Sequence, residues 1–337
     1  MTDPTSRTDS EETCPEAPRR LFTRRRVLLG VGGLTGAAVL GAGGFLLHDY
    51  GRRFGRGAEY LIPDHRVGLE PAAPRMVIAH GVDPACNVRA AVERLGGMSR
   101  FVTPADVVVV KPNIGWERTA EQGANTHPEV VAEVVRLCHE AGAGRVIVSD
   151  CPVRSSSGAF ERSGILAAAL AAGAEVILPE ESRYLAVEIS PRLGTWDILE
   201  PFVIATKLIN VPVAKHHDLT GVTAGLKNWI GITGKLRVMF HQDLQRSIAE
   251  LAALMRPTLT VVDASRVLME HGPAGGSVHD VKPVRTIAAG VDPVALDAWA
   301  CSLFGVATLP ANLSLAASMG LGQVDFAALG PVEIITG

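Results

Sequence analysis

The chain has 337 residues, of which 47% are hydrophobic and 20% are charged, and its formal net charge is −3. This length is sufficient for one large domain or two smaller ones, and the composition is typical of a globular protein. A net charge this close to zero gives no general attraction to nucleic acid, so nucleic acid is excluded as an expected partner.

The cysteines form no metal-binding motif. There are five of them, they are widely spaced, and no two are arranged as Cys-x-x-Cys. The sequence therefore predicts neither a zinc ribbon nor a self-contained iron–sulfur site. A metal or an iron–sulfur centre stays open as a cofactor, but no cysteine cluster supports it.

The N-terminus predicts an export signal. Residues 1–26 end in a basic cluster, and residues 27–47 are uncharged and rich in Gly, Ala and Leu. The stretch TRRRVL resembles a twin-arginine signal, with Arg24 and Arg25 as the pair and Arg25-Arg26 as the alternative register. We expect the twin-arginine export machinery as a partner and an extracytoplasmic location. An ordinary membrane anchor through residues 27–47 is the alternative, and the same segment would tether an uncleaved protein.

Residues 48–74 are rich in Arg, Gly and Pro without sustained periodicity, which indicates a tether. The domain is expected over residues 75–337. It begins with the strand RMVIAH, and Asp83-Pro84 then supplies a cap and first-turn proline for a helix through CNVRAAVERLGG.

Strands and helices then alternate. The run DVVVVKPN is typical of a buried parallel strand, and a capping box at Thr126 opens the helix that follows it. Further strands are RVIVSD, EVILP, KLINVPV and TLTVVDAS, with GAFERSGILAAALAAGA, HQDLQRSIAELAALMR and DPVALDAWACSLFG as helices. This order predicts an α/β fold with an open, mostly parallel, Rossmann-like sheet and helices on both faces, in one large domain.

Polar residues terminate these strands, where ligands bind in open parallel sheets. Lys111 and Asn113 end one strand, Asp150 ends the next, and Asn210 and Lys215 follow a third. Turn formation and helix capping can explain Asp and Asn there, but they do not explain lysine. The sequence therefore predicts an anionic small molecule as ligand, with Lys111 and Lys215 as candidate catalytic residues.

Four separated motifs resemble one known family. They are VVVVKPNIGWE, THPEVVAEVVRLCHEAGAGRVIVSD, LINVPVAKHHDLTGVTAGLKNWIGITG and AGVDPVALDAWACSLFG. In this order they resemble the domain of unknown function 362 family. The resemblance implies a fold and a site while leaving the reaction open. Some members of that family carry appended ferredoxin-like cysteine clusters, and this chain has none.

Residues 214–234 are expected to form a loop with a short turn of helix, because they contain four glycines and little periodicity. The spacing of Gly221, Gly225, Lys227 and Asn228 does not match a Walker motif. It is compatible with another kind of anion nest, made of backbone N–H groups around Gly221 and Gly225 with help from Lys227.

The remaining candidates are proton-active side chains. His217 is a candidate general base, or a metal ligand together with His127 and Asp150, and an exposed loop histidine is the alternative. Asp297 lies on a nearly apolar helix, where a buried carboxylate needs a partner such as Lys227 or Lys111, unless it faces solvent.

Three functions remain open from the sequence. The first is an exported enzyme that acts on an anionic small molecule. The second is a metal- or redox-cofactor-binding protein of an envelope electron-transfer or maturation pathway. The third is a non-catalytic ligand-binding module.

Overall fold

The computed structural model describes residues 59–68, 73–234, 237–306 and 308–337. The predicted basic region of the export signal, residues 1–26, and its hydrophobic signal or anchor segment, residues 27–47, lie outside the described residues. Within the described part, no helix combines the length and the hydrophobicity that crossing a membrane requires.

The described residues contain a central sheet of 10 strands. Eight of them follow one another across the sheet in this order: β12 (Val332–Ile335), β1 (Met76–His80), β11 (Val281–Gly290), β10 (Leu259–Leu268), β7 (Lys207–Val211), β2 (Val107–Pro112), β3 (Arg145–Ser149) and β4 (Glu175–Ile177). Pairing is parallel from β10 to β4 and between β1 and β12, and β11 runs antiparallel to both of its neighbours. The predicted α/β class with a mostly parallel sheet is confirmed.

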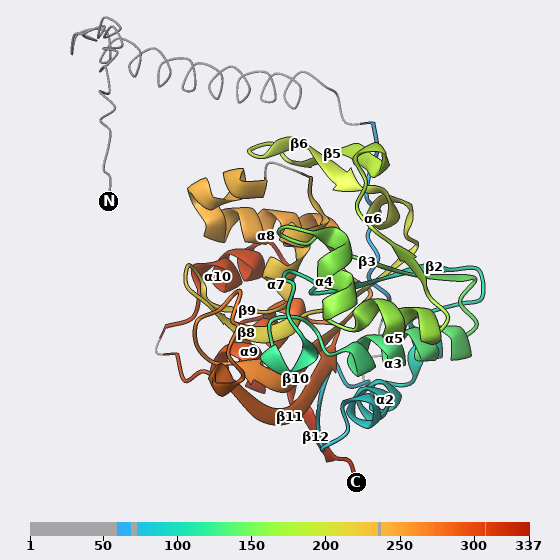
Figure 1. Ribbon diagram of the computed structural model, residues 1–337, viewed down its shortest axis with the longest axis vertical. Coiled ribbons are helices and arrows are strands. Elements are labelled where there is room, and N and C mark those ends of the chain that lie inside the picture. Colours follow the sequence, from blue (N-terminus) through green and yellow to red (C-terminus); the bar gives the residue numbers. More distant parts are fainter. Residues whose placement is uncertain (1–58, 69–72, 235–236, 307) are drawn as a thin grey trace, which may run out of the picture. The chain divides into compact units, whose positions relative to one another are not determined.

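Two hydrophobic layers enclose the sheet because successive side chains of a strand point to opposite faces. In β2, Val108 and Val110 pack in one layer, whereas Val109 packs in the other. The first layer is covered by α2 (Pro84–Arg94), α3 (Pro128–Glu140), α4 (Ser156–Arg162) and α5 (Ile165–Ala171). The second is covered by α6 (Glu200–Ile204), α7 (Gly225–Asn228), α8 (Leu244–Met255), α9 (Pro293–Ser302) and α10 (Ala311–Ser318). Figure 1 shows α2, α3 and α5 gathered on one side of the sheet and α8 and α10 on the other.

Two helix predictions need correction. The segment GAFERSGILAAALAAGA forms two helices, α4 and α5, because Gly164 takes a left-handed conformation with φ 77° between them. The cap of α3 is His127, whose Nδ1 accepts a hydrogen bond from the Glu129 amide, and not Thr126. The Thr126 hydroxyl instead donates to the Val211 carbonyl at 2.7 Å, which ties the start of α3 to β7.

The loop predicted over residues 214–234 is also wrong at its start. Strand β8 (Val213–His217) continues after β7, pairs in parallel with β10, and pairs antiparallel with β9 (Gly221–Thr223). Helix α7 follows directly. Lys215 and His217 are buried in β8 because the interior supplies polar partners, which hydropathy alone does not reveal.

Two further features were not predicted. An antiparallel hairpin, β5 (Tyr184–Ser190) with β6 (Gly194–Leu199), forms a second sheet. Residues 59–68, inside the predicted tether, contact the domain: the amides of Glu59 and Tyr60 donate to the Ala186 carbonyl, and the buried His65 bonds to Thr206. Over these residues the chain is packed on the domain and does not form a free tether.

Candidate functional site

A buried lysine and aspartate join the ends of β2 and β3. Lys111 Nζ donates to Asp150 Oδ1 at 2.7 Å, to Asn228 Oδ1 at 3.1 Å and to the Pro112 carbonyl at 3.0 Å. The parallel register of β2 and β3 brings the two strand ends together, as the sequence argument expected. The second oxygen of Asp150 accepts the Ile114 amide at 2.5 Å, so the carboxylate also holds the loop after β2.

Two asparagines, Asn228 and Asn113, connect Lys111 to Lys215, and a third, Asn210, orients Asn228. Asn228 Oδ1 accepts a second hydrogen bond from Asn113 Nδ2 at 2.9 Å, and Asn113 Oδ1 accepts from Lys215 Nζ at 2.9 Å. Asn228 Nδ2 donates to Asn210 Oδ1 at 2.8 Å, which fixes the orientation of the Asn228 amide. These five side chains form one continuous hydrogen-bonded network, although they come from four separate segments of the chain.

Burial gives the lysines unusual proton affinities. Burial lowers the pKa of Lys111, and the neighbouring Asp150 partly opposes that shift. Burial, followed by repulsion from Lys227, lowers the pKa of Lys215 to about 7. Burial and then repulsion from Arg237 lower the pKa of Lys227 to about 8. Lys215 therefore lies near enough to Lys227 and Lys111 for their charges to lower its pKa.

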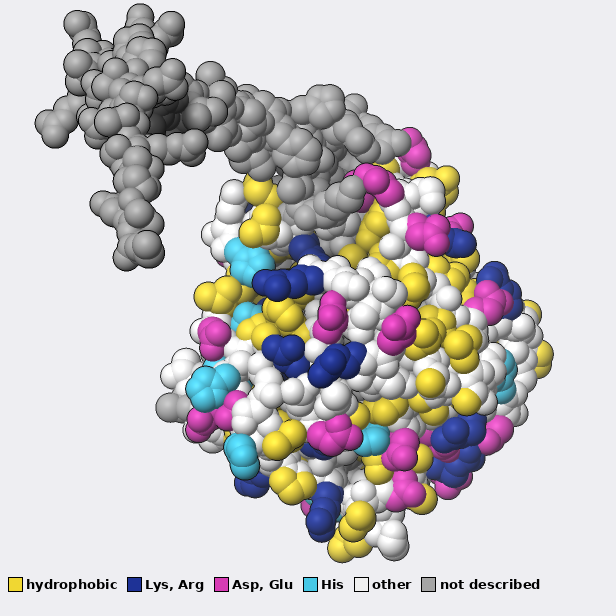
Figure 2. Space-filling view, in the orientation of Figure 1, with side chains coloured by type: hydrophobic (Ala, Val, Ile, Leu, Met, Phe, Trp, Pro, Cys, Tyr) yellow, Lys and Arg dark blue, Asp and Glu magenta, His cyan; other side chains and the backbone are white. Residues whose placement is uncertain are grey.

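This positive charge is internal. Lys111 has an exposed fraction of 0% and Lys215 of 3%. On the face of the molecule in Figure 2, basic and acidic side chains are interspersed among hydrophobic ones, so that face has no broad basic patch. Lys111 and Lys215 therefore lie inside the protein, whereas Lys227 is partly exposed.

Sequence reasoning missed Arg237, which borders the lysines. Its guanidinium donates to the Cys151 carbonyl at 2.5 Å and to the Pro152 carbonyl, directly after Asp150. The signal in the sequence was a basic residue three positions beyond the last glycine of the segment 214–234. Gly231 is a further missed residue, since a Cβ atom there would lie 2.4 Å from Asp150 Oδ1 and 3.0 Å from Lys111 Nζ.

His217 is buried beside the lysines. Its Nδ1 accepts the Leu219 amide at 3.1 Å. Burial, and then the positive charges of Lys227 and Lys215, lower the pKa of His217 to about 3. The imidazole is therefore neutral at physiological pH and is a weaker base than was expected.

The anion nest predicted at Gly221 and Gly225 is not formed. Gly221 belongs to β9, and a Cβ atom built on it would meet nothing within 4 Å. The amides of Gly225 and Leu226 donate to the two oxygens of Asp297, at 2.6 and 3.0 Å. The Asp297 carboxylate thus already occupies the N–H groups that were expected to bind a ligand anion.

Neither predicted lysine holds Asp297. Its carboxylate accepts backbone hydrogen bonds at the start of α7, and burial raises its pKa to about 7 in spite of them. Asp297 positions the helix that carries Lys227 and Asn228. The sequence did identify correctly that a carboxylate on this apolar helix needs partners.

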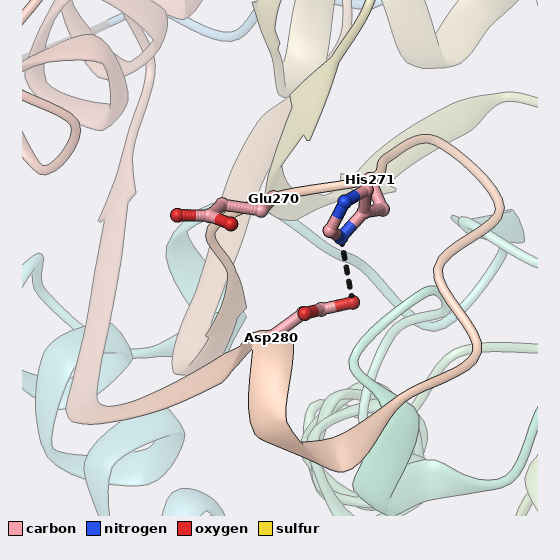
Figure 3. A group of neighbouring side chains, drawn as sticks. All are labelled: Glu270, His271 and Asp280. Atoms are coloured by element: carbon pink, nitrogen blue, oxygen red, sulfur yellow. Dashed lines mark hydrogen bonds and ion pairs between the residues drawn. The ribbon is translucent and has the colours of Figure 1, made fainter.

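The candidate metal ligands His127, His217 and Asp150 do not come together. His127 caps α3 and its amide donates to Asp263 Oδ2 at 2.7 Å. In the described part of the chain, the one group of three metal-ligating side chains within mutual reach is Glu270, His271 and Asp280. Figure 3 shows this group, in which His271 Nδ1 lies 3.1 Å from Asp280 Oδ2 and a Glu270 carboxylate oxygen lies within 4.8 Å of the ligand atoms of the other two residues. Glu270 and His271 are exposed, and nothing further marks a metal site there.

Comparisons relate this chain to a curated protein, a solved structure and a family model. A thylakoid-associated protein, sll1697, of Synechocystis is 30% identical over 220 residues, which cover 63% of this chain and 67% of that protein. The lactate racemase apoprotein of Thermoanaerobacterium thermosaccharolyticum aligns with a TM-score of 0.38 and 14% identity, over 72% of this chain and 58% of the racemase. The chain thus spans less than two thirds of the racemase. The model of the family described as "Domain of unknown function (DUF362)" matches residues 108–302, which include Lys111, Asp150, Lys215 and Asn228, and this chain therefore belongs to the DUF362 family.

Proposed function

We propose that this protein binds an anionic small molecule at the cluster formed by Lys111, Lys215 and Lys227. The observation that carries the proposal is a charge imbalance. Lys111 is paired with Asp150, but within the described residues neither Lys215 nor Lys227 forms an ion pair with a carboxylate. Like charges that are crowded and desolvated favour either loss of protons or the arrival of an anion.

We further propose that the protein is an enzyme in which Lys215 transfers a proton. A pKa of about 7 gives comparable amounts of ammonium and free amine at neutral pH, which is the range that suits a general acid or base. Asn113 and the Ala124 carbonyl accept hydrogen bonds from Lys215 Nζ at 2.9 and 2.5 Å, so the amine is held in one position. Lys111 contributes its pair with Asp150, and His217 contributes a neutral imidazole.

We also propose an extracytoplasmic, membrane-associated location. The twin-arginine-like pair Arg24 and Arg25 and the hydrophobic residues 27–47 support it, and a relative is named as thylakoid-associated. These residues lie outside the described part of the structure.

The binding proposal is tested by thermal unfolding with inorganic phosphate, malonate and oxalate against sodium chloride at equal ionic strength. At least one of the three anions should raise the unfolding temperature of the wild type, and Lys215→Met should lose most of that shift. Lys282→Met, which removes an exposed lysine on β11, is the matched control and should keep the shift.

A second readout follows from the lysine pKa values. An anion that binds beside Lys215 favours its charged form, so binding near pH 8 should take up protons from the buffer. Calorimetry in buffers with different ionisation enthalpies measures that number directly. Binding with no proton uptake, or equal anion responses of the two lysine variants, would refute the proposed site.

A further inference from the structure

A small cavity lies beside α7 and is lined in part by Lys227 and Asp297. Its volume is about 10 Å³, and its lining comes from β9, α7, α8, α9, α10 and the turn before β9. The polar residues among this lining are Thr220, Thr223, Lys227, Asp297 and Asn312. A cavity of this size holds about one water molecule, provided that two to four polar groups face it.

Two buried polar atoms of this lining lack partners. Within the described residues, Thr220 Oγ1 and Asn312 Oδ1 have no hydrogen-bond partner, and the two side chains belong to residues with exposed fractions of 6% and 5%. Buried hydroxyl and amide oxygens are nearly always hydrogen-bonded in native proteins, to protein or to ordered water. Thr220 Oγ1 and Asn312 Oδ1 line the same water-sized cavity, so one shared hydrogen-bond partner can satisfy both atoms.

The hydrogen-bonding capacity of the lining fits water. The Asn312 amide oxygen needs a donor, and the Thr220 hydroxyl can donate or accept. Each Asp297 oxygen accepts one backbone amide and retains capacity for another donor. One water molecule can donate to Asn312 Oδ1 and to the Asp297 carboxylate while it accepts the Thr220 hydroxyl hydrogen. The side chain of Lys227 in the same lining disfavours a metal cation there.

We propose that this cavity is a binding site for a single structural water molecule, which links Thr220 at the β8–β9 turn to Asn312 at the start of α10. The cavity shares Lys227 with the proposed anion site and adjoins the helix that carries Lys227 and Asn228. Through Asp297, the water connects α9 and α10 to the start of α7. It therefore helps to position the short helix on which the asparagine network depends.

A crystal structure of the wild-type protein at high resolution tests the proposal directly. One peak should lie within hydrogen-bond distance, about 2.7–3.2 Å, of both Thr220 Oγ1 and Asn312 Oδ1. A second crystal, soaked in a thallium salt, should give no anomalous signal at this position. A cavity without density, or a thallium signal that marks a monovalent cation site, would overturn the proposal.

Paired substitutions test the link in solution. Thr220→Val and Asn312→Leu each remove one polar partner with little change in side-chain volume, so each should lower the unfolding temperature. The double variant should lose clearly less than the sum of the two shifts, because neither of the two positions then keeps a polar atom that needs the water. Asn312→Leu combined with the distant Thr336→Val is the control and should be additive. Additive shifts in unfolding temperature for the Thr220 and Asn312 pair would contradict the shared water. If a variant does not fold, the electron density of the wild-type cavity decides whether the water is present.

Discussion

Lys111 Nζ lies 2.7 Å from Asp150 Oδ1, and the two side chains have exposed fractions of 0% and 2%. The two residues are 39 positions apart and end neighbouring parallel strands. Removing one member of such a pair leaves a buried charge without its partner, which costs more than the pair itself contributes. The site and the stability of the sheet are therefore linked through this contact.

The first prediction follows from that contact. Lys111→Met or Asp150→Asn alone should lower the free energy of unfolding by about 3–5 kcal/mol, measured by urea denaturation. The double variant should lose less than the two single losses together, since no charge is left unpaired. Arg145→Ala is the control: it breaks the exposed Arg145–Glu175 pair between β3 and β4, and should cost less than about 1 kcal/mol. Equal losses at the buried and exposed pairs would contradict this account.

The second prediction concerns Lys215 and pH. Its pKa in the folded state is about 7, against an ordinary value of 10.5, so the unfolded chain binds more protons between these values. The free energy of unfolding should therefore rise as the pH increases above 7, by up to about 1.4 kcal/mol per pH unit from this residue. Lys215→Met should remove that contribution, so its pH profile between 7 and 9 should be flatter than that of the wild type. Parallel profiles would show that Lys215 keeps an ordinary pKa.

The third prediction has the opposite sign and concerns Asp297. Its folded pKa is raised to about 7, against an ordinary value of 3.8, so the folded protein binds more protons within this window. The stability contributed by Asp297 is thus greatest below about pH 4 and is lost as the pH rises towards 7. Asp297→Asn should be destabilising at every pH because one backbone amide loses its acceptor. The loss in the free energy of unfolding should be largest near pH 4 and should shrink towards pH 7. Urea denaturation at each pH measures it. A loss that grows over this range would exclude the raised pKa of Asp297.

The fourth prediction tests the close approach of the backbone at Gly231. A Cβ atom there would lie 2.4 Å from Asp150 Oδ1, so Gly231→Ala must displace the Lys111–Asp150 pair. We expect a loss of a few kcal/mol together with a loss of any anion-dependent stabilisation. Gly115→Ala lies in the same region, where the added Cβ would meet only Asn113 Oδ1 at an ordinary 3.7 Å. That control should stay within about 1 kcal/mol of the wild type; similar losses in the two variants would refute the argument from close approach.

The fifth prediction concerns export. Arg24→Lys combined with Arg25→Lys keeps the positive charge but removes the planar guanidinium groups. If the twin-arginine machinery exports the protein, the double variant should accumulate in the cytoplasm, as measured by fractionation and immunoblotting. Arg19→Lys combined with Arg20→Lys is the matched control, since it changes an earlier arginine pair of the same basic region and should leave export intact. Unchanged export of the Arg24 and Arg25 variant would indicate another route.

The sequence by itself determined the class of fold and the end of the sheet at which the polar residues gather. The run of valines before Lys111 and the alternating strands and helices are local patterns, and parallel strands bring their carboxyl ends to one edge of the sheet. That geometry was enough to place Lys111, Asn113, Asp150, Asn210 and Lys215 near one another.

Only the tertiary structure decided which side chain bonds to which. The amide of Gly225 donates a hydrogen bond to Asp297 and not to a ligand. The reason is that α9 places the Asp297 carboxylate there, although Asp297 lies 72 residues later in the chain. His217 becomes a weak base because burial and the charges of Lys227 and Lys215 act on it together. Lys215 lies in a strand, although its surroundings in the sequence suggested a loop, because Asn113 and the Ala124 carbonyl satisfy its amine in the interior. Local periodicity records which residues face a core, whereas hydrogen bonds and desolvation depend on neighbours that are remote in the chain.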